Sequence, residues 1–149
     1  MRESVKATKV LTAPMDAVWQ LISDGDRVER WFEWVDETIL NDGREGGSRV
    51  IRMKDGSCFD EHITLNNART LTYQYYAPDP PLPVKHVIGT KRIETSADGG
   101  AVLTWSVSFD LTPSAPHDML KTMRELYEGA MAKIDQHAHQ RVTSRPSAR

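Results

Sequence analysis

Apolar and polar residues alternate along four consecutive segments between residues 59 and 111. A period of two indicates strands with one buried face and one wet face. Single charged residues fall on faces that are otherwise apolar: Glu61 alternates with Ile63, and Lys91 alternates with Ile93. A charge on a buried face is costly unless it is paired or reaches water. The pattern therefore predicts a curved sheet around a pocket.

The remaining segments predict the elements that surround these strands. We expect further strands at residues 4–12, 35–40 and 48–54, two short helices at residues 14–24 and 26–32, and a long amphipathic helix at residues 116–138. Pro14 suits the first turn of a helix, because its missing N–H costs little there. The proline-rich segment 76–83 predicts a stiff loop at one end of the sheet, since proline has no ladder donor. This order predicts an antiparallel meander whose concave face is covered by the long helix.

Length and composition indicate one domain and exclude several function classes. The chain has 149 residues and a net charge of -2, which argues against a general nucleic-acid binder. Cys58 is the one cysteine, so an intramolecular disulfide and a cysteine-based metal site are excluded. No apolar run is long enough for stable membrane insertion, and the first ten residues lack the apolar core of a signal peptide. We therefore expect a cytoplasmic protein, with a single domain at 1–140 and a disordered basic tail at 141–149.

Short motifs along the chain carry a family likeness. They are L-T-A-P-M-D-A-V-W-Q-L-I-S-D at 11–24, Trp31 in R-W-F-E-W-V, Glu61 in D-E-H-I-T, L-T-Y at 71–73, P-L-P-V at 81–84, G-T at 89–90 and D-G-G-A-V-L-T-W-S-V-S-F at 98–109. In order and spacing the chain resembles the helix-grip superfamily often called SRPBCC, which includes START lipid-transfer domains and birch-pollen-allergen-like proteins. Within this superfamily the chain most resembles the polyketide cyclase/dehydrase-like group. The resemblance covers about residues 5–138. It implies an α+β helix-grip fold, in which a curved antiparallel sheet of about seven strands wraps around a long C-terminal helix, with two short helices after the first strand.

Four charged residues are candidates for the inside of the predicted pocket: Lys9, Arg49, Glu61 and Lys91. Together they would carry three positive charges and one negative charge, which favours an anionic or polyphenolic ligand. Burial favours the uncharged form of such groups, so it raises the pKa of a carboxyl group and lowers the pKa of a lysine. Glu61, Lys91 and Tyr73 are therefore candidate catalytic acids or bases. The alternative is that the charges lie at strand ends, reach the mouth of the pocket, or pair with one another.

Aromatic and apolar residues form a second candidate set. Tyrosine combines an apolar body with a hydroxyl that needs a partner when buried, and methionine suits an adaptable pocket wall. The predicted ligand-binding residues are Trp31, Trp34, Glu61, Tyr73, Tyr75, Val87, Lys91, Met123 and Tyr127. Trp31 and Trp34 either line the mouth or anchor the short helices. We expect Trp105 to pack as core beneath the long helix.

The sequence predicts no metal and no cofactor. Asp135, His137 and His139 have the composition of a metal site, but only Asp135 and His139 share a helical face. His62 and His86 fall on the polar faces of their strands, so we expect them to be exposed. The chain has no nucleophile elbow, Walker loop or dinucleotide fingerprint.

These observations favour a binding or carrier protein for a small hydrophobic or aromatic molecule, which includes anionic ones. The resemblance also permits a polyketide cyclase, aromatase or dehydratase that acts by orientation and general acid–base catalysis. It permits as well a protein-interaction module like the activators of a heat-shock ATPase. That role needs an exposed apolar patch, for which Trp31, Phe32 and the proline loop are the visible sources. Whether the chain is an enzyme, and whether it is a monomer or a homodimer, stays open.

Overall fold

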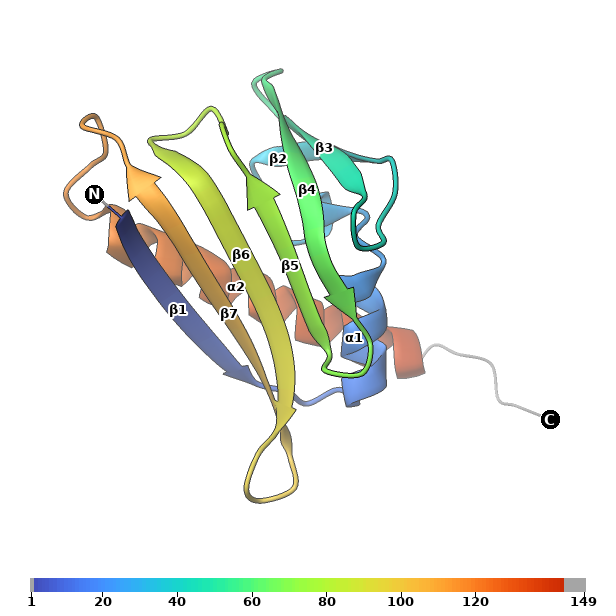
Figure 1. The fold of residues 1–149 in the computed structure, drawn as a ribbon. Helices are drawn as coiled ribbons and strands as arrows, with labels where there is room; N and C mark the ends of the chain where they lie inside the picture. The colour runs from blue at the N-terminus through green and yellow to red at the C-terminus, as the bar shows by residue number, and fades with distance from the viewer. Residues whose placement is uncertain (1, 144–149) are drawn as a thin grey trace.

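The computed structural model describes residues 2–143, and one seven-stranded antiparallel sheet dominates them (Figure 1). The strands are β1 Arg2–Val10, β2 Val35–Leu40, β3 Ser48–Met53, β4 Cys58–Asn67, β5 Thr72–Ala77, β6 Val84–Thr95 and β7 Ala101–Leu111. They lie in the order β1-β7-β6-β5-β4-β3-β2. From β2 to β7 each strand pairs with the next along the chain, and β1 is added beside β7. The predicted meander is confirmed.

The long helix α2, Met119–Thr143, runs across the concave face of the sheet (Figure 1). The short helix α1, Met15–Ser23, begins directly after Pro14 and packs against α2. Gly25 follows it with a φ of 71°, a left-handed conformation that glycine adopts without a steric penalty. The helix-grip fold predicted from the sequence is therefore confirmed.

Two predicted elements differ in extent from those observed. The second short helix is a single 3₁₀ turn, η1, at Val28–Arg30, preceded by Arg27 with a φ of 58°. Three residues are a usual length for 3₁₀ geometry, whose hydrogen bonds are poorer than those of an α-helix. Helix α2 reaches Thr143 and so includes the first three residues of the predicted tail. The rest of that tail, 144–149, lies outside the described residues.

Three β-bulges bend the sheet. The register shifts lie between Val35 and Glu37 in β2, between Ile63 and Leu65 in β4, and between Lys85 and Ile88 in β6. A bulge inserts an extra residue on one strand and increases the local twist and bend. The bends curve the sheet around α2, so that inward side chains of distant strands face a common space.

A buried carboxylate joins α2 to the segment between β1 and α1. The side chain of Asp135 accepts hydrogen bonds from the backbone N–H groups of Thr12, at 3.0 Å, and Ala13, at 2.9 Å. It also accepts one from the Thr12 hydroxyl at 2.7 Å. Burial opposes ionisation, but these hydrogen bonds lower the pKa of Asp135 below its usual value. Asp135, one of the residues considered above as metal ligands, therefore binds backbone and hydroxyl groups of the protein itself.

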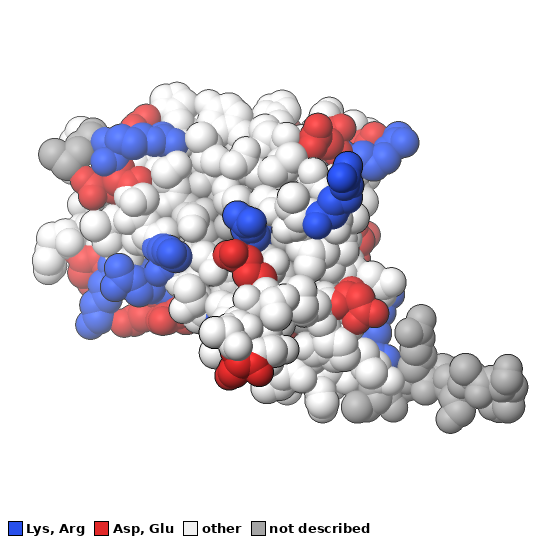
Figure 2. Space-filling model, turned by 60° about the horizontal axis from the view of Figure 1, so that its bottom comes forward, with Lys and Arg blue, Asp and Glu red and all other residues white. Residues whose placement is uncertain are grey.

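The surface carries charges of both signs. Figure 2 shows basic and acidic side chains interspersed over one face, with uncharged surface between them. Such mixing gives that face no extended field of a single sign. No helix within residues 2–143 combines the length and the apolar character that a membrane span requires.

Candidate functional site

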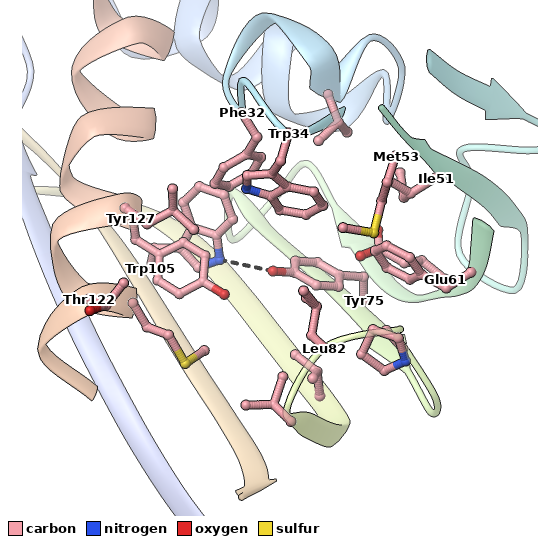
Figure 3. Close-up of a pocket in the computed structure, with 18 of the residues that line it drawn as sticks. Phe32, Trp34, Ile51, Met53, Glu61, Tyr75, Leu82, Trp105, Thr122 and Tyr127 are labelled. Atoms are coloured by element: carbon pink, nitrogen blue, oxygen red, sulfur yellow. Dashed lines mark hydrogen bonds between the residues drawn. The ribbon is translucent and has the colours of Figure 1, made fainter. Parts of the chain in front are cut away.

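A cavity of about 350 Å³ lies between the concave face of the sheet and α2 (Figure 3). Its wall is mainly apolar, and six aromatic residues contribute to it: Phe32, Trp34, Phe59, Tyr75, Trp105 and Tyr127. Val87 on β6 and Met123 on α2 complete the apolar part predicted from the sequence. The volume falls at the lower end of the range for small-molecule pockets, roughly 300–1,000 Å³.

Arg49 and Glu61 form a buried ion pair in the cavity wall. They are direct partners across β3 and β4, and the Nε and Nη2 atoms of Arg49 each lie 2.7 Å from Glu61 Oε1. Arg49 Nη1 also donates to the carbonyl of Gly25 at 2.7 Å, which joins β3 to the end of α1. Burial opposes the charge of Arg49, but Glu61 raises the pKa of that guanidinium above its usual value. The Arg49 side chain is therefore held in place by Glu61 on one side and by the carbonyl of Gly25 on the other.

Lys91 lies in a cross-strand row with two aromatic residues. Tyr73 on β5 and Trp105 on β7 are its direct partners on either side. Lys91 Nζ lies 4.3 Å from the centroid of the Trp105 ring, and its side chain is 4% exposed. Burial, and then the charge of Arg49, lower the pKa of Lys91 to about 7. The amine is therefore a group that can hold or release a proton near neutral pH.

Tyr75 and Trp105 are joined by a hydrogen bond at the floor of the cavity. Trp105 Nε1 donates to the Tyr75 hydroxyl at 3.2 Å (Figure 3). The Tyr75 ring can reach Trp105 because Gly89, its partner on β6, has no side chain in the way. Burial raises the pKa of Tyr75 well above its usual value, so its phenol stays protonated. Trp105 is buried beneath α2, as expected, and it also lines the cavity.

Tyr73 and Trp31 lie outside the cavity lining, unlike the other predicted ligand-binding residues. Tyr73 is fully buried behind the wall, and its hydroxyl has no hydrogen-bond partner among residues 2–143. Burial raises the pKa of Tyr73 to about 12. Trp31 packs edge to face against His137 on α2, with ring centroids 5.2 Å apart. It anchors η1 to α2, which is one of the two roles predicted for it.

Three of the four predicted inward charges reach the cavity. Arg49, Glu61 and Lys91 line it, whereas Lys9 on the edge strand β1 is partly exposed and does not. The cavity therefore carries two basic groups and one acidic group, rather than three and one. His62 and His86 are exposed, and His86 Nδ1 lies 2.8 Å from a carboxylate oxygen of Asp110.

The chain's loops and the first turns of α2 supply cavity residues that the sequence pattern did not predict. Phe32 comes from the segment after η1, Pro80 and Leu82 from the proline-rich loop, and Met119 and Thr122 from α2. Residues in loops follow no apolar period, so the sequence pattern could not predict that Phe32, Pro80 and Leu82 face the cavity. The composition of the proline-rich loop was the one signal that could have suggested Pro80 and Leu82. Trp31 and Phe32 are 4% and 5% exposed, and so they do not supply the exposed apolar patch that an interaction module needs.

No group of three or more potential metal ligands occurs within residues 2–143. Asp135 is held by Thr12 and Ala13, and His137 by its contact with Trp31.

Comparison with known proteins bears on this site. The model of the family described as polyketide cyclase/dehydrase and lipid transport matches residues 2–139. The chain belongs to this family. The resemblance to SRPBCC proteins is thereby confirmed, and the family is one of proteins with a ligand-binding cavity.

Members of the same fold occur among solved structures. An uncharacterised protein from Bacillus thuringiensis superposes with a TM-score of 0.75 at 18% identity, over 91% of this chain and 98% of its own. The protein XoxI from Bacillus cereus gives a TM-score of 0.74 at 18% identity, over 97% and 99%. Ara h 8.0201 gives 0.73 at 17% identity, over 93% and 98%. At these identities the likeness shows the fold alone. A comparison with curated proteins finds no match.

Proposed function

We propose that this family member binds one small aromatic or hydrophobic molecule in the cavity between the sheet and α2, as a carrier or binding protein. The observation that carries the proposal is the composition of the cavity. A mainly apolar and aromatic wall carries three charged side chains, those of Arg49, Glu61 and Lys91. Ligand pockets commonly have this form, with apolar walls for affinity and a few polar groups for orientation.

The charges favour a ligand with an anionic or electron-rich polar end. Arg49 is neutralised by Glu61, and so a protonated Lys91 supplies the net positive charge of the cavity. A carboxylate or phenolate placed beside Lys91 would stabilise its ammonium form. The aromatic body of the same molecule would lie against Trp105 and Tyr127, whose ring centroids are 4.7 Å apart.

Native mass spectrometry of the purified protein is the first test. We expect a retained mass that is lost on collisional activation, or, for protein stripped of ligand, uptake of naphthoate and naphthalenemethanol. Calorimetry then gives the affinity for the two probes, one anionic and one neutral. Protein that takes up neither probe and carries no added mass would contradict the proposal.

A matched pair of variants localises the binding. Val87 points into the cavity from β6, whereas Val10 on β1 is 70% exposed. We expect Val87→Phe to weaken binding of both probes by about tenfold or more, which is 1.4 kcal/mol. The same substitution at Val10 should leave binding unchanged. Equal affinities for the two variants would place the ligand elsewhere.

A cyclase or dehydratase is the second candidate, because the cavity also holds groups that can move protons. Lys91 has its pKa near 7, and the Tyr75 phenol stays protonated beside it. Such a pair could orient a poly-β-keto chain and exchange protons with it. Turnover of such a chain that is unchanged by both Glu61→Gln and Lys91→Met would rule out this assignment.

A further inference from the structure

The amine of Lys91 has no conventional partner. Within residues 2–143 this amine forms no hydrogen bond and no ion pair, and it lies over the rings of three aromatic residues. Lysine is almost never buried in this way unless it is paired. An unpaired buried amine is therefore a feature that stability alone does not explain.

The amine also has access to the cavity. The Tyr73 hydroxyl is the one fully buried side-chain polar atom without a partner among the described residues. Lys91 Nζ has no partner either, so it must keep some accessible surface. Because Lys91 lines the cavity, that surface faces the space where a ligand would lie.

Three aromatic rings lie close to the amine. Its Nζ atom lies 4.3 Å from the ring centroid of Trp105, 5.5 Å from that of Tyr73 and 5.8 Å from that of Tyr75. The guanidinium of Arg49 lies over the same two tyrosine rings, at 5.7 and 5.6 Å. Two basic side chains therefore lie over the same pair of rings.

This environment makes the amine a nucleophile. Burial and the charge of Arg49 lower the pKa of Lys91, while the charges of Glu61 and Asp24 partly offset them. A large fraction of the amine is therefore unprotonated at neutral pH, with its nitrogen lone pair free. Desolvated lysines next to another cation are the kind that form Schiff bases with carbonyl compounds.

We propose that Lys91 captures aldehyde- or ketone-bearing aromatic ligands as a Schiff base inside the cavity. The nitrogen lone pair attacks the carbonyl carbon, a C–N bond forms, and the C=O π electrons move to oxygen. A proton passes from nitrogen to oxygen to give a carbinolamine, which loses its hydroxyl and the second N–H proton as water. The net reaction joins one amine and one carbonyl into one imine and releases one water.

Glu61 is a second group in the cavity that can take part in the proton transfers. Its Oε1 atom accepts a hydrogen bond from Arg49 Nε and is ion-paired with Arg49 Nη2, and its second oxygen has no partner among the described residues. That oxygen is not fully buried, and so it also faces the cavity. The inference rests on the proposed function, since it requires that the cavity admits an aromatic molecule, and it names the chemical class of that molecule.

Reductive trapping tests the inference. Full-length protein is mixed with naphthaldehyde and sodium cyanoborohydride at pH 7, and the modified lysines are found by peptide mass spectrometry. We expect labelling at Lys91 about tenfold or more faster than at the exposed Lys54 and Lys121, because a naphthaldehyde bound in the cavity is held beside the Lys91 amine. An excess of naphthalenemethanol, which has the same shape but no carbonyl, should protect Lys91 and leave the exposed lysines unprotected.

The variants Lys91→Met and Lys91→Arg should both lose the fast label, and their folding can be checked by circular dichroism. The competition by naphthalenemethanol uses the unaltered protein and so does not depend on either variant. Labelling that is no faster at Lys91 than at Lys54, in protein that binds naphthalenemethanol, would overturn the inference and leave the proposed function standing. Protein that binds neither naphthalenemethanol nor naphthaldehyde would overturn both.

Discussion

The ring of Tyr75 lies across Gly89 so closely that a Cβ atom at residue 89 would fall 2.1 Å from Tyr75 Cζ. The two residues are direct partners on β5 and β6. The missing side chain lets the Tyr75 ring lie flat against β6 and accept the hydrogen bond of Trp105 on β7. Gly89 therefore shapes the floor of the cavity without contributing a side chain to it.

We expect Gly89→Ala to lower the free energy of unfolding by about 1–3 kcal/mol, because the ring must move or the strands must part. Urea unfolding measures this. Gly129 on α2 is the matched control, since a Cβ there meets no atom within 4 Å. Gly129→Ala should be neutral or stabilising by up to about 1 kcal/mol. The steric explanation predicts that Gly89→Ala costs more stability in the wild type than in the Tyr75→Ala variant, which has no ring to displace. Equal costs in the two proteins would show that the explanation is wrong.

The ion pair of Arg49 and Glu61 should be strongly coupled. Arg49→Met or Glu61→Leu alone leaves a buried charge without its partner, and each should cost about 3–5 kcal/mol of unfolding free energy. The double variant should cost clearly less than the sum of the two. The exposed pair of Arg52 with Glu37, on the neighbouring strands, is the control. Arg52→Met should cost about 1 kcal/mol or less, because exposed pairs contribute little.

A double-mutant cycle by urea unfolding supplies the coupling energy of the buried pair. Additive effects of Arg49→Met and Glu61→Leu would show that the two side chains do not stabilise one another in solution.

The titration of Lys91 should make stability rise with pH. Its pKa is about 7 in the folded protein and 10.5 without the protein environment. Between these values the unfolded chain binds more protons at this residue, so the unfolding free energy increases with pH. From pH 7 to pH 9 we expect a gain on the order of 1–3 kcal/mol that Lys91→Met removes. Well below pH 7 both states are protonated, and there this residue adds no pH dependence.

Urea unfolding at pH 7, 8 and 9 gives this profile, with the exposed Lys54→Met as a control that should keep the wild-type slope. The range ends below pH 10, because burial raises the pKa of Tyr75 and Tyr127, and their ionisation in the unfolded chain acts in the opposite direction. A Lys91→Met variant with the wild-type slope would show that Lys91 does not titrate between these pH values.

Asp135 should protect the fold at neutral pH and lose its effect in acid. Its pKa is lowered by the hydrogen bonds from Ala13 and Thr12, so its contribution is present above the unfolded value of 3.8 and is lost as pH falls further. Asp135→Asn removes the charge and one acceptor, and should cost about 1–3 kcal/mol at pH 7. The difference between the variant and the wild type should shrink as the pH is lowered below 4, which acid titration followed by circular dichroism measures. A difference that stays constant would contradict this origin.

The alternating pattern was enough to place Glu61 and Lys91 on the inner face, because side-chain direction in a strand depends only on local backbone geometry. The same rule placed Tyr75 and Val87, and the helical period placed Met123 and Tyr127 on the side of α2 that faces the cavity. These contributions are local, and so the sequence by itself determined them. It also determined the order of the elements, from which the helix-grip fold follows.

The tertiary structure decided which inward residues meet the cavity. Tyr73 and Tyr75 share a face of β5, yet the Tyr73 hydroxyl lies near Gly25 at the end of α1, whereas Tyr75 is free to cross Gly89. Lys9 follows the same alternation as Lys91, but β1 is an edge strand and leaves it partly exposed. Such outcomes depend on strand order and on which element covers each end of the sheet.

The tertiary structure also decided that Arg49 pairs with Glu61 and that loop residues contribute to the cavity wall. Arg49 precedes Val50, which breaks the apolar alternation, and its direction was settled by the register of β3 against β4. Phe32 and Leu82 come from segments without a period, and they reach the cavity because the fold brings those segments to it. The local pattern determines where each side chain points, and only long-range packing determines what it meets there.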